Sequence, residues 1–197
     1  MALKRKGNAK ESTAVEYDKL GEGEFDGRLV YVADLGLQEG MMWKGVQKDD
    51  TQQLSLGIEI VGNHVTIDGK QVPRILWTQP FNVFRTLTEK GREIQMYNVF
   101  GKGVIGEEAD WDAALGQPCN VKVIAKSNKE GDKVFDNIES LGSIPTKFQD
   151  KIEKNELEPC IGDSDDPENE ATKALFGLAK WVFDKRIKEE NSDNPYA

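Results

Sequence analysis

The chain has 197 residues, 38% hydrophobic and 31% charged, which is enough apolar material for one packed domain with solvated ends. No run of about 18 apolar residues is present, and the basic start lacks the apolar segment of a secretory signal, so we expect a cytoplasmic protein with no membrane partner. Two cysteines, Cys119 and Cys160, are too few for a disulfide framework.

The net charge of −9 is concentrated toward one end of the sequence. Residues 153–197 hold twelve Asp and Glu against six Lys and Arg, so residues 1–152 carry only −3. Affinity for nucleic acid comes largely from cations that displace counterions from phosphates. The overall acidity therefore argues against a polyanionic partner, but its distribution leaves the body of the chain able to bind one.

Three strands are predicted after a flexible, basic arm at residues 1–20. Within residues 25–35, apolar side chains occur in both alternating sets of positions, Leu29 and Tyr31 in one and Val30 and Val32 in the other. This pattern is typical of a strand buried on both faces. A long polar connection at residues 36–51 follows, and it is interrupted only by the apolar cluster Met41-Met42-Trp43.

The second strand is the clearest element of the sequence. Apolar residues alternate with small or polar ones over residues 54–60, and the pattern resumes up to Ile67. Asp68-Gly69 then predicts a hairpin turn, because both positions tolerate positive φ. The third strand is predicted at residues 72–78.

The second half of the sequence predicts helices around one further hairpin. Residues 86–100 fit either a helix or a strand, and the helix formers favour a helix. Residues 107–115 indicate a short helix closed by glycine and proline. Residues 119–125 and 134–138 alternate again and predict two paired strands.

A C-terminal amphipathic helix is predicted at residues 167–188. Asp166 is its expected N-cap, Pro167 suits its first position, and apolar residues recur along one stripe from Ala171 to Phe183. The remaining residues, 189–197, are acidic, and we expect them to be disordered.

The order of elements predicts an OB-like fold within residues 21–148. Three strands, a helix and two further strands are the elements of a five-stranded OB barrel, which binds oligonucleotides on strands two and three and through the loops that join strands one to two and four to five. Residues 149–188 would form a C-terminal extension. The predicted class is mainly β with helices.

Several segments resemble a family of tailed-phage single-stranded-DNA-binding proteins with an OB core. Together they span roughly residues 24–185, in matching order and spacing. The segments are Arg28 to Gly36, Trp43-Lys44-Gly45, Ile58-Glu59, Leu115 to Cys119, Asn137-Ile138, Ser143 to Pro145 and Asp165 to Pro167. The resemblance implies binding of single-stranded DNA in phage replication, recombination or repair, in the cytoplasm of an infected bacterium.

Candidate DNA contacts combine aromatic rings with cations, because each unpaired base offers a ring face beside a phosphate. They occur in the three places where an OB-fold binds nucleic acid. The candidates are Trp43, Lys44 and Lys48 in the first connection, Arg74 and Trp77 in the third strand, and Lys126, Lys129 and Lys133 in the second hairpin. Two alternatives to DNA contact stay open. Each of the two tryptophans could pack against the protein, and the lysines could serve only to solubilise a turn.

The last residues, Asp193 to Ala197, are similar to the acidic tail tip of bacterial and phage single-strand binders, although Ala197 follows the aromatic residue. The resemblance implies that this tail recruits a polymerase, helicase or primase. The implied partner-binding residues are Glu189, Glu190, Asp193, Pro195 and Tyr196.

No catalytic residue, metal site or cofactor is predicted. Gly101 to Gly106 has the spacing of a dinucleotide fingerprint, but a hairpin rather than a parallel βαβ unit follows it. Two other functions remain open on the sequence. One is a virion structural or decoration protein, and the other is an adaptor or inhibitor that uses the Met-Trp cluster as an interface anchor.

Overall fold

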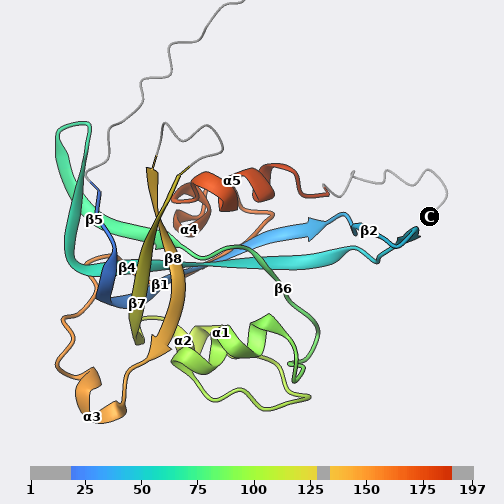
Figure 1. The fold of residues 1–197 in the computed structure, drawn as a ribbon, viewed down its shortest axis with the longest axis horizontal. Helices are drawn as coiled ribbons and strands as arrows, with labels where there is room; N and C mark the ends of the chain where they lie inside the picture. Colours follow the sequence, from blue (N-terminus) through green and yellow to red (C-terminus); the bar gives the residue numbers. More distant parts are fainter. Residues whose placement is uncertain (1–18, 128–133, 188–197) are drawn as a thin grey trace, which may run out of the picture.

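The computed structural model describes residues 19–127 and 134–187 and is mainly β, with a large antiparallel sheet (Figure 1). The main strands are ordered β5-β4-β1-β7-β8. Their bounds are β1 (Gly23–Gln38), β4 (Thr51–Ile67), β5 (Lys70–Trp77), β7 (Pro118–Ser127) and β8 (Val134–Ser143). The five predicted strands are therefore confirmed, and each is longer than its apolar pattern indicated.

β1 is the central strand of the sheet and has partners on both edges. β4 pairs with it antiparallel from Gly27 to Gln38. On the other edge β7 pairs with residues 23–28, and the short strand β9 (Cys160–Gly162) continues in parallel at Tyr31–Ala33. β1 is apolar on both faces because both faces are buried: Leu29 and Val32 lie in the main core cluster, and Val30, Ala33 and Leu35 lie in two further clusters.

The two predicted hairpins are confirmed. Asp68 and Gly69 have φ values of 50° and 76° and form the turn between β4 and β5, as their tolerance of positive φ predicts. β7 and β8 pair antiparallel from Cys119–Ser143 to Ser127–Val134.

The predicted barrel is not confirmed, because the sheet does not close. β5 and β8 are the end strands of the order, and they do not pair within the described residues. A side-chain contact links them instead: Arg74 Nη1 lies 3.6 Å from Asp136 Oδ2, with both side chains buried. Asp136 also accepts the Leu20 backbone N–H at 2.7 Å, so the start of the described chain is fixed at the same place.

Helices cover both faces of the sheet (Figure 1). On one face α1 (Arg92–Phe100) and α2 (Trp111–Ala114) place Ile94, Tyr97 and Trp111 over the main core. Tyr97 and Trp111 meet edge to face, with ring centroids 5.2 Å apart. The helix favoured for residues 86–100 is thus confirmed, and the one predicted at 107–115 is shorter than expected.

On the opposite face lie α4 (Glu170–Lys173) and α5 (Gly177–Asp184). The prediction of one continuous helix at 167–188 is wrong, because Phe176 is extended and Gly177 has a φ of 58°, which interrupts the helix. Asn169, not Asp166, is the N-cap of α4, and its side chain accepts the Ala171 N–H.

Five shorter elements were not predicted. They are the paired strands β2 (Met42–Trp43) and β3 (Val46–Gln47), the strand β6 (Phe81–Asn82) beside β4, the helix α3 (Thr146–Gln149), and β9. Within the described residues, no helix is long and apolar enough to cross a membrane.

Candidate nucleic-acid interface

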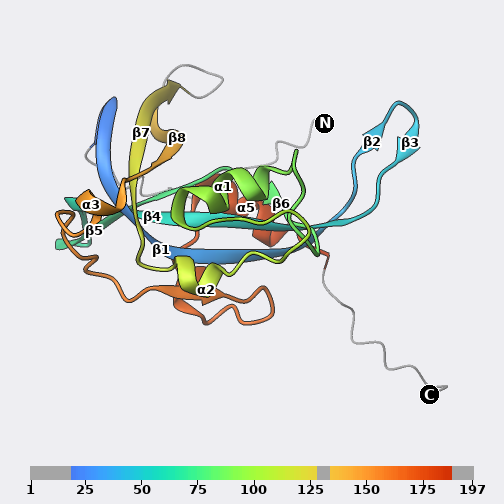
Figure 2. The same cartoon turned by 90° about the horizontal axis from the view of Figure 1, so that it is seen from below.

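The connection between β1 and β4 is a small hairpin that projects from the end of the sheet (Figure 2). Met42 pairs with Gln47 and Trp43 with Val46. Lys44 and Gly45 form the turn with φ values of 50° and 77°, the backbone form that a tight hairpin turn needs. The Lys48 N–H donates to the Met41 carbonyl at 3.2 Å and closes the base of the hairpin.

The β2–β3 hairpin exposes large apolar side chains. The exposed fractions are 81% for Met41, 64% for Met42, 61% for Trp43 and 61% for Val46. Trp43 therefore does not pack back on the sheet, which was the alternative to ligand contact. Lys44 Nζ lies 5.9 Å from the centre of its ring, and Lys48 is exposed nearby in sequence. An aromatic face beside cations is what a base and its phosphate require.

The β7–β8 hairpin projects to the same side of the sheet, at its other end (Figure 2). Lys126 pairs in register with Phe135, whose side chain is 53% exposed. A ring and a cation are therefore neighbours here too. Lys129 and Lys133 lie outside the described residues, as do the five tail residues Glu189, Glu190, Asp193, Pro195 and Tyr196.

The two candidates in β5 are not at the surface. The Arg74 side chain is only 8% exposed and forms the ion pair with Asp136. Trp77 is half-buried and stacks on Tyr31, with ring centroids 6.1 Å apart, and its indole N–H donates to the Ala174 carbonyl at 3.2 Å. The packing alternative therefore holds for Trp77, and we leave both residues out of the proposed interface.

One exposed tryptophan was missed. Trp181 on α5 is 55% exposed, with Lys185 Nζ 3.8 Å from the centre of its ring. The apolar stripe from Ala171 to Phe183 predicts only the buried face of this segment. The available signal was that Trp181 lies off that stripe and is flanked by Lys180 and Lys185.

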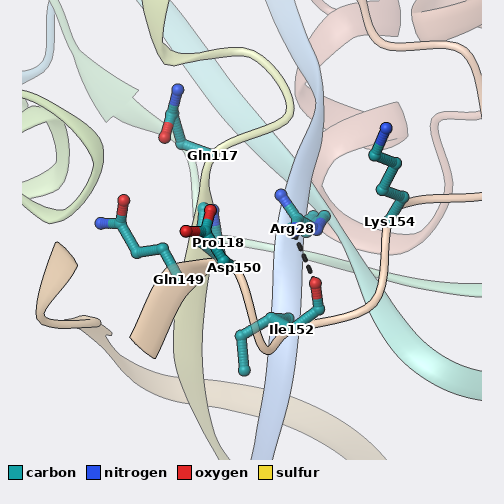
Figure 3. Close-up of a pocket in the computed structure, with 7 residues that line it drawn as sticks. All are labelled: Arg28, Gln117, Pro118, Gln149, Asp150, Ile152 and Lys154. Carbon is teal, nitrogen blue, oxygen red and sulfur yellow. Dashed lines mark hydrogen bonds between the residues drawn. The ribbon is translucent and has the colours of Figure 1, made fainter. Parts of the chain in front are cut away.

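Two pockets lie away from the hairpins. One, of about 280 Å³, is lined by Arg28, Gln117, Pro118, Gln149, Asp150, Ile152 and Lys154 (Figure 3). Arg28 donates there to the carbonyls of Gly116, Ile152 and Glu153 at 2.6–2.7 Å, so its guanidinium holds two loops together.

The second pocket, of about 310 Å³, is lined by Glu93 of α1, Trp111 of α2 and residues 83–85, which follow β6. Burial raises the pKa of Glu93, while the hydrogen bond from the Phe84 N–H and the nearby Trp111 side chain lower it less. In residues 19–127 and 134–187, no three His, Cys, Asp or Glu side chains are grouped so that they could hold a metal ion.

No protein-family model matches the sequence, and no curated protein or solved structure matches it significantly. The function is therefore inferred from the chemistry and geometry of its own residues.

Proposed function

We propose that the protein binds single-stranded DNA with little sequence preference, in phage DNA replication, recombination or repair. The observation that carries the proposal is the β2–β3 hairpin, which holds Trp43 in solvent beside Lys44. A soluble domain gains nothing in stability from such exposure, and a large exposed apolar group is typical of a binding surface. The second hairpin contributes Lys126 and Phe135.

The order of elements supports an OB-like arrangement. β1, β4 and β5 follow one another, α1 comes next, and β7 and β8 complete the sheet. In an OB-fold the third and fifth strands approach each other to close the barrel. Here the corresponding strands, β5 and β8, are linked by the buried Arg74–Asp136 pair. In this proposed arrangement, the two hairpins that present rings and cations correspond to the loops that bind oligonucleotides in that fold.

The energetics of this interface predict its behaviour. Stacking of one base on an aromatic ring contributes about 1–3 kcal/mol and tolerates any base. Lysine contacts to phosphates release counterions, so affinity falls as salt rises. The protein should therefore prefer single strands, whose bases are free to stack, over a duplex.

The test is fluorescence anisotropy of a labelled oligo-dT and of a duplex of the same length, at two salt concentrations. Trp43→Ala should weaken single-strand binding by about 5- to 150-fold, the equivalent of one lost stack. Trp43→Phe should retain most of the affinity. Val46→Ala is the matched control, because Val46 is the exposed cross-strand neighbour of Trp43 and has no ring.

Equal affinity for duplex and single strand, or no binding to either, would overturn the proposal. The apolar surface of Met41, Met42 and Trp43 also suits a protein partner, so an adaptor or inhibitor is the second candidate function. It is favoured if the wild-type protein binds no oligonucleotide. Recruitment of a polymerase, helicase or primase by residues 189–197 is part of the leading proposal.

A further inference from the structure

The outward face of α5 is an exposed surface that the fold does not use. Leu178, Trp181 and Lys185 are spaced three and four residues apart, so they lie on one side of the helix. Leu178 is 52% and Trp181 55% exposed. The residues that pack on the sheet, Ala179, Val182 and Phe183, lie on the other side. The apolar face that anchors α5 is thus separate from this one.

The charge around α5 is opposite to that of the whole chain. Residues 172–187 hold four cations and one acid, although the protein carries −9. Lys173 pairs with Glu168 and Glu170, and Lys180 pairs with Asp184. No described carboxylate forms an ion pair with Lys185, which lies instead over the ring of Trp181. An aromatic face with an available cation again matches a base and its phosphate.

α5 ends beside the strand that leads into the β2–β3 hairpin (Figure 1). The Ile187 N–H donates to the Leu37 carbonyl at 2.8 Å. Gly36 also lies against the end of this segment, because a Cβ atom added at Gly36 would be only 2.7 Å from Cδ of Arg186. From Leu37 the chain needs only a few residues to reach Met42. The two exposed tryptophans are therefore carried by elements that meet at Leu37.

We propose that Leu178, Trp181 and Lys185 form a second contact for the same single strand of DNA, which runs from the β2–β3 hairpin onto α5. This inference rests on the proposed function. It adds a consequence that one hairpin site alone does not have: affinity should depend on whether the oligonucleotide is long enough to reach both tryptophans. One OB-fold covers about 4–16 nucleotides of a single strand, so the oligonucleotide lengths to compare lie in this range and just beyond it.

The experiment measures anisotropy with oligo-dT of about 6 nucleotides, near the lower end of that range, and of about 20 nucleotides, above its upper end. Trp181→Ala should lower the affinity for the long oligonucleotide by about 5-fold or more. It should lower the affinity for the short one by less than about 2-fold, because a short strand still binds at the hairpin. Trp181→Phe should restore the long-strand affinity.

Lys185→Gln keeps the ring and should lower the slope of log affinity against log salt by about one for the long strand. The matched control is Phe148→Ala. Phe148 is 42% exposed and has Lys147 and Lys151 near its ring, but it lies on α3, at the opposite end of the molecule from α5 (Figure 1). Its loss should not change long-strand affinity.

The outcomes separate this inference from the proposed function. If Trp43→Ala weakens binding and neither Trp181→Ala nor Lys185→Gln changes the long-strand result, the α5 contact is overturned and the function stands. If the wild-type protein binds neither oligonucleotide, both proposals fail. Sedimentation velocity tests whether a second copy of the chain binds this face of α5 instead of DNA. If Trp181→Ala abolishes self-association and leaves DNA affinity unchanged, the face is an interface between copies, and the inference is overturned.

Discussion

Glu59 and Glu93 are buried carboxylates in very different surroundings. Glu59 is 2% exposed and accepts two backbone N–H groups, from Glu156 at 2.8 Å and Leu157 at 3.0 Å. Glu93 is 6% exposed and accepts the Phe84 N–H at 3.3 Å, a longer bond. Burial is costly for a charged group unless hydrogen bonds compensate it. The pKa of Glu93 is accordingly raised, chiefly by desolvation.

A raised pKa in the folded state makes stability depend on pH in a definite direction. The folded protein holds the Glu93 proton more tightly than the unfolded chain, so this contribution to stability is full below the ordinary glutamate pKa and is lost as pH rises through the raised value. Glu93→Gln should therefore differ little from wild type near pH 4 and have the higher free energy of unfolding near pH 7.

Urea unfolding across that pH range checks this prediction. Glu108→Gln is the control, because Glu108 lines the same pocket with an exposed side chain. A difference between Glu93→Gln and wild type that shrinks as pH rises would contradict the stated direction of the shift.

The segment after α3 depends on one side chain of β4. Since Glu59 accepts the N–H groups of Glu156 and Leu157, it fixes the segment just before β9. Glu59→Ala should lower the free energy of unfolding by about 2–4 kcal/mol, because two charge-assisted hydrogen bonds are lost. Glu59→Gln should cost less, because its oxygen still accepts one bond.

Urea unfolding and limited proteolysis near residue 156 measure this effect. Glu153→Ala, a change of an exposed side chain in the same segment, should stay within about 0.5 kcal/mol of wild type. If Glu59→Ala were as mild as this control, Glu59 would not anchor the segment.

The elements that the sequence predicted well are those whose signals are local. Alternation defines β4, Asp68-Gly69 defines its turn, and helix formers define α1. β9 carries no such signal, because three residues are too few for a period, and its strand form depends on β1. The break at Gly177 was missed because an apolar stripe tolerates a glycine.

The candidate site follows the same division. Exposure of Trp43 could be anticipated from its place in a polar connection. The burial of Arg74 and Trp77 could not, because it depends on Asp136 and on Ala174, which are distant in sequence. For Trp181 the sequence offered a partial signal, its position off the apolar stripe, but its exposure depends on how α5 packs on the sheet.

At the scale of the whole molecule, we expect an acidic segment and DNA to compete for the same lysines. Residues 189–197 contribute Glu189, Glu190 and Asp193, whose charge is opposite to that of the lysines proposed to contact DNA. Deleting these nine residues should leave the free energy of unfolding unchanged and tighten single-strand binding. The gain should be largest at low salt, where charges act over about 30 Å instead of about 8 Å.

Two variants of full length refine this prediction. Neutralising the three acids as Glu189→Gln, Glu190→Gln and Asp193→Asn should reproduce the gain in DNA affinity. Tyr196→Ala should leave DNA affinity unchanged and reduce recruitment of a replication partner. Weaker DNA binding after the deletion would mean that residues 189–197 contribute to the site, contrary to the competition proposed.

The double pairing of β1 also has a consequence for synthesis on the ribosome. β4 follows β1 closely in the sequence. The partners on the other edge are made much later: Gly27 pairs with Cys119, and Tyr31 pairs with Cys160. At about 5–20 residues per second, translation leaves that edge open for on the order of 5–25 s. During this interval the nascent chain presents an apolar, unpaired strand, the kind of edge that joins neighbouring chains. Aggregation should therefore threaten the growing polypeptide more than the finished protein, and slower initiation, which spaces ribosomes apart, should raise the soluble yield.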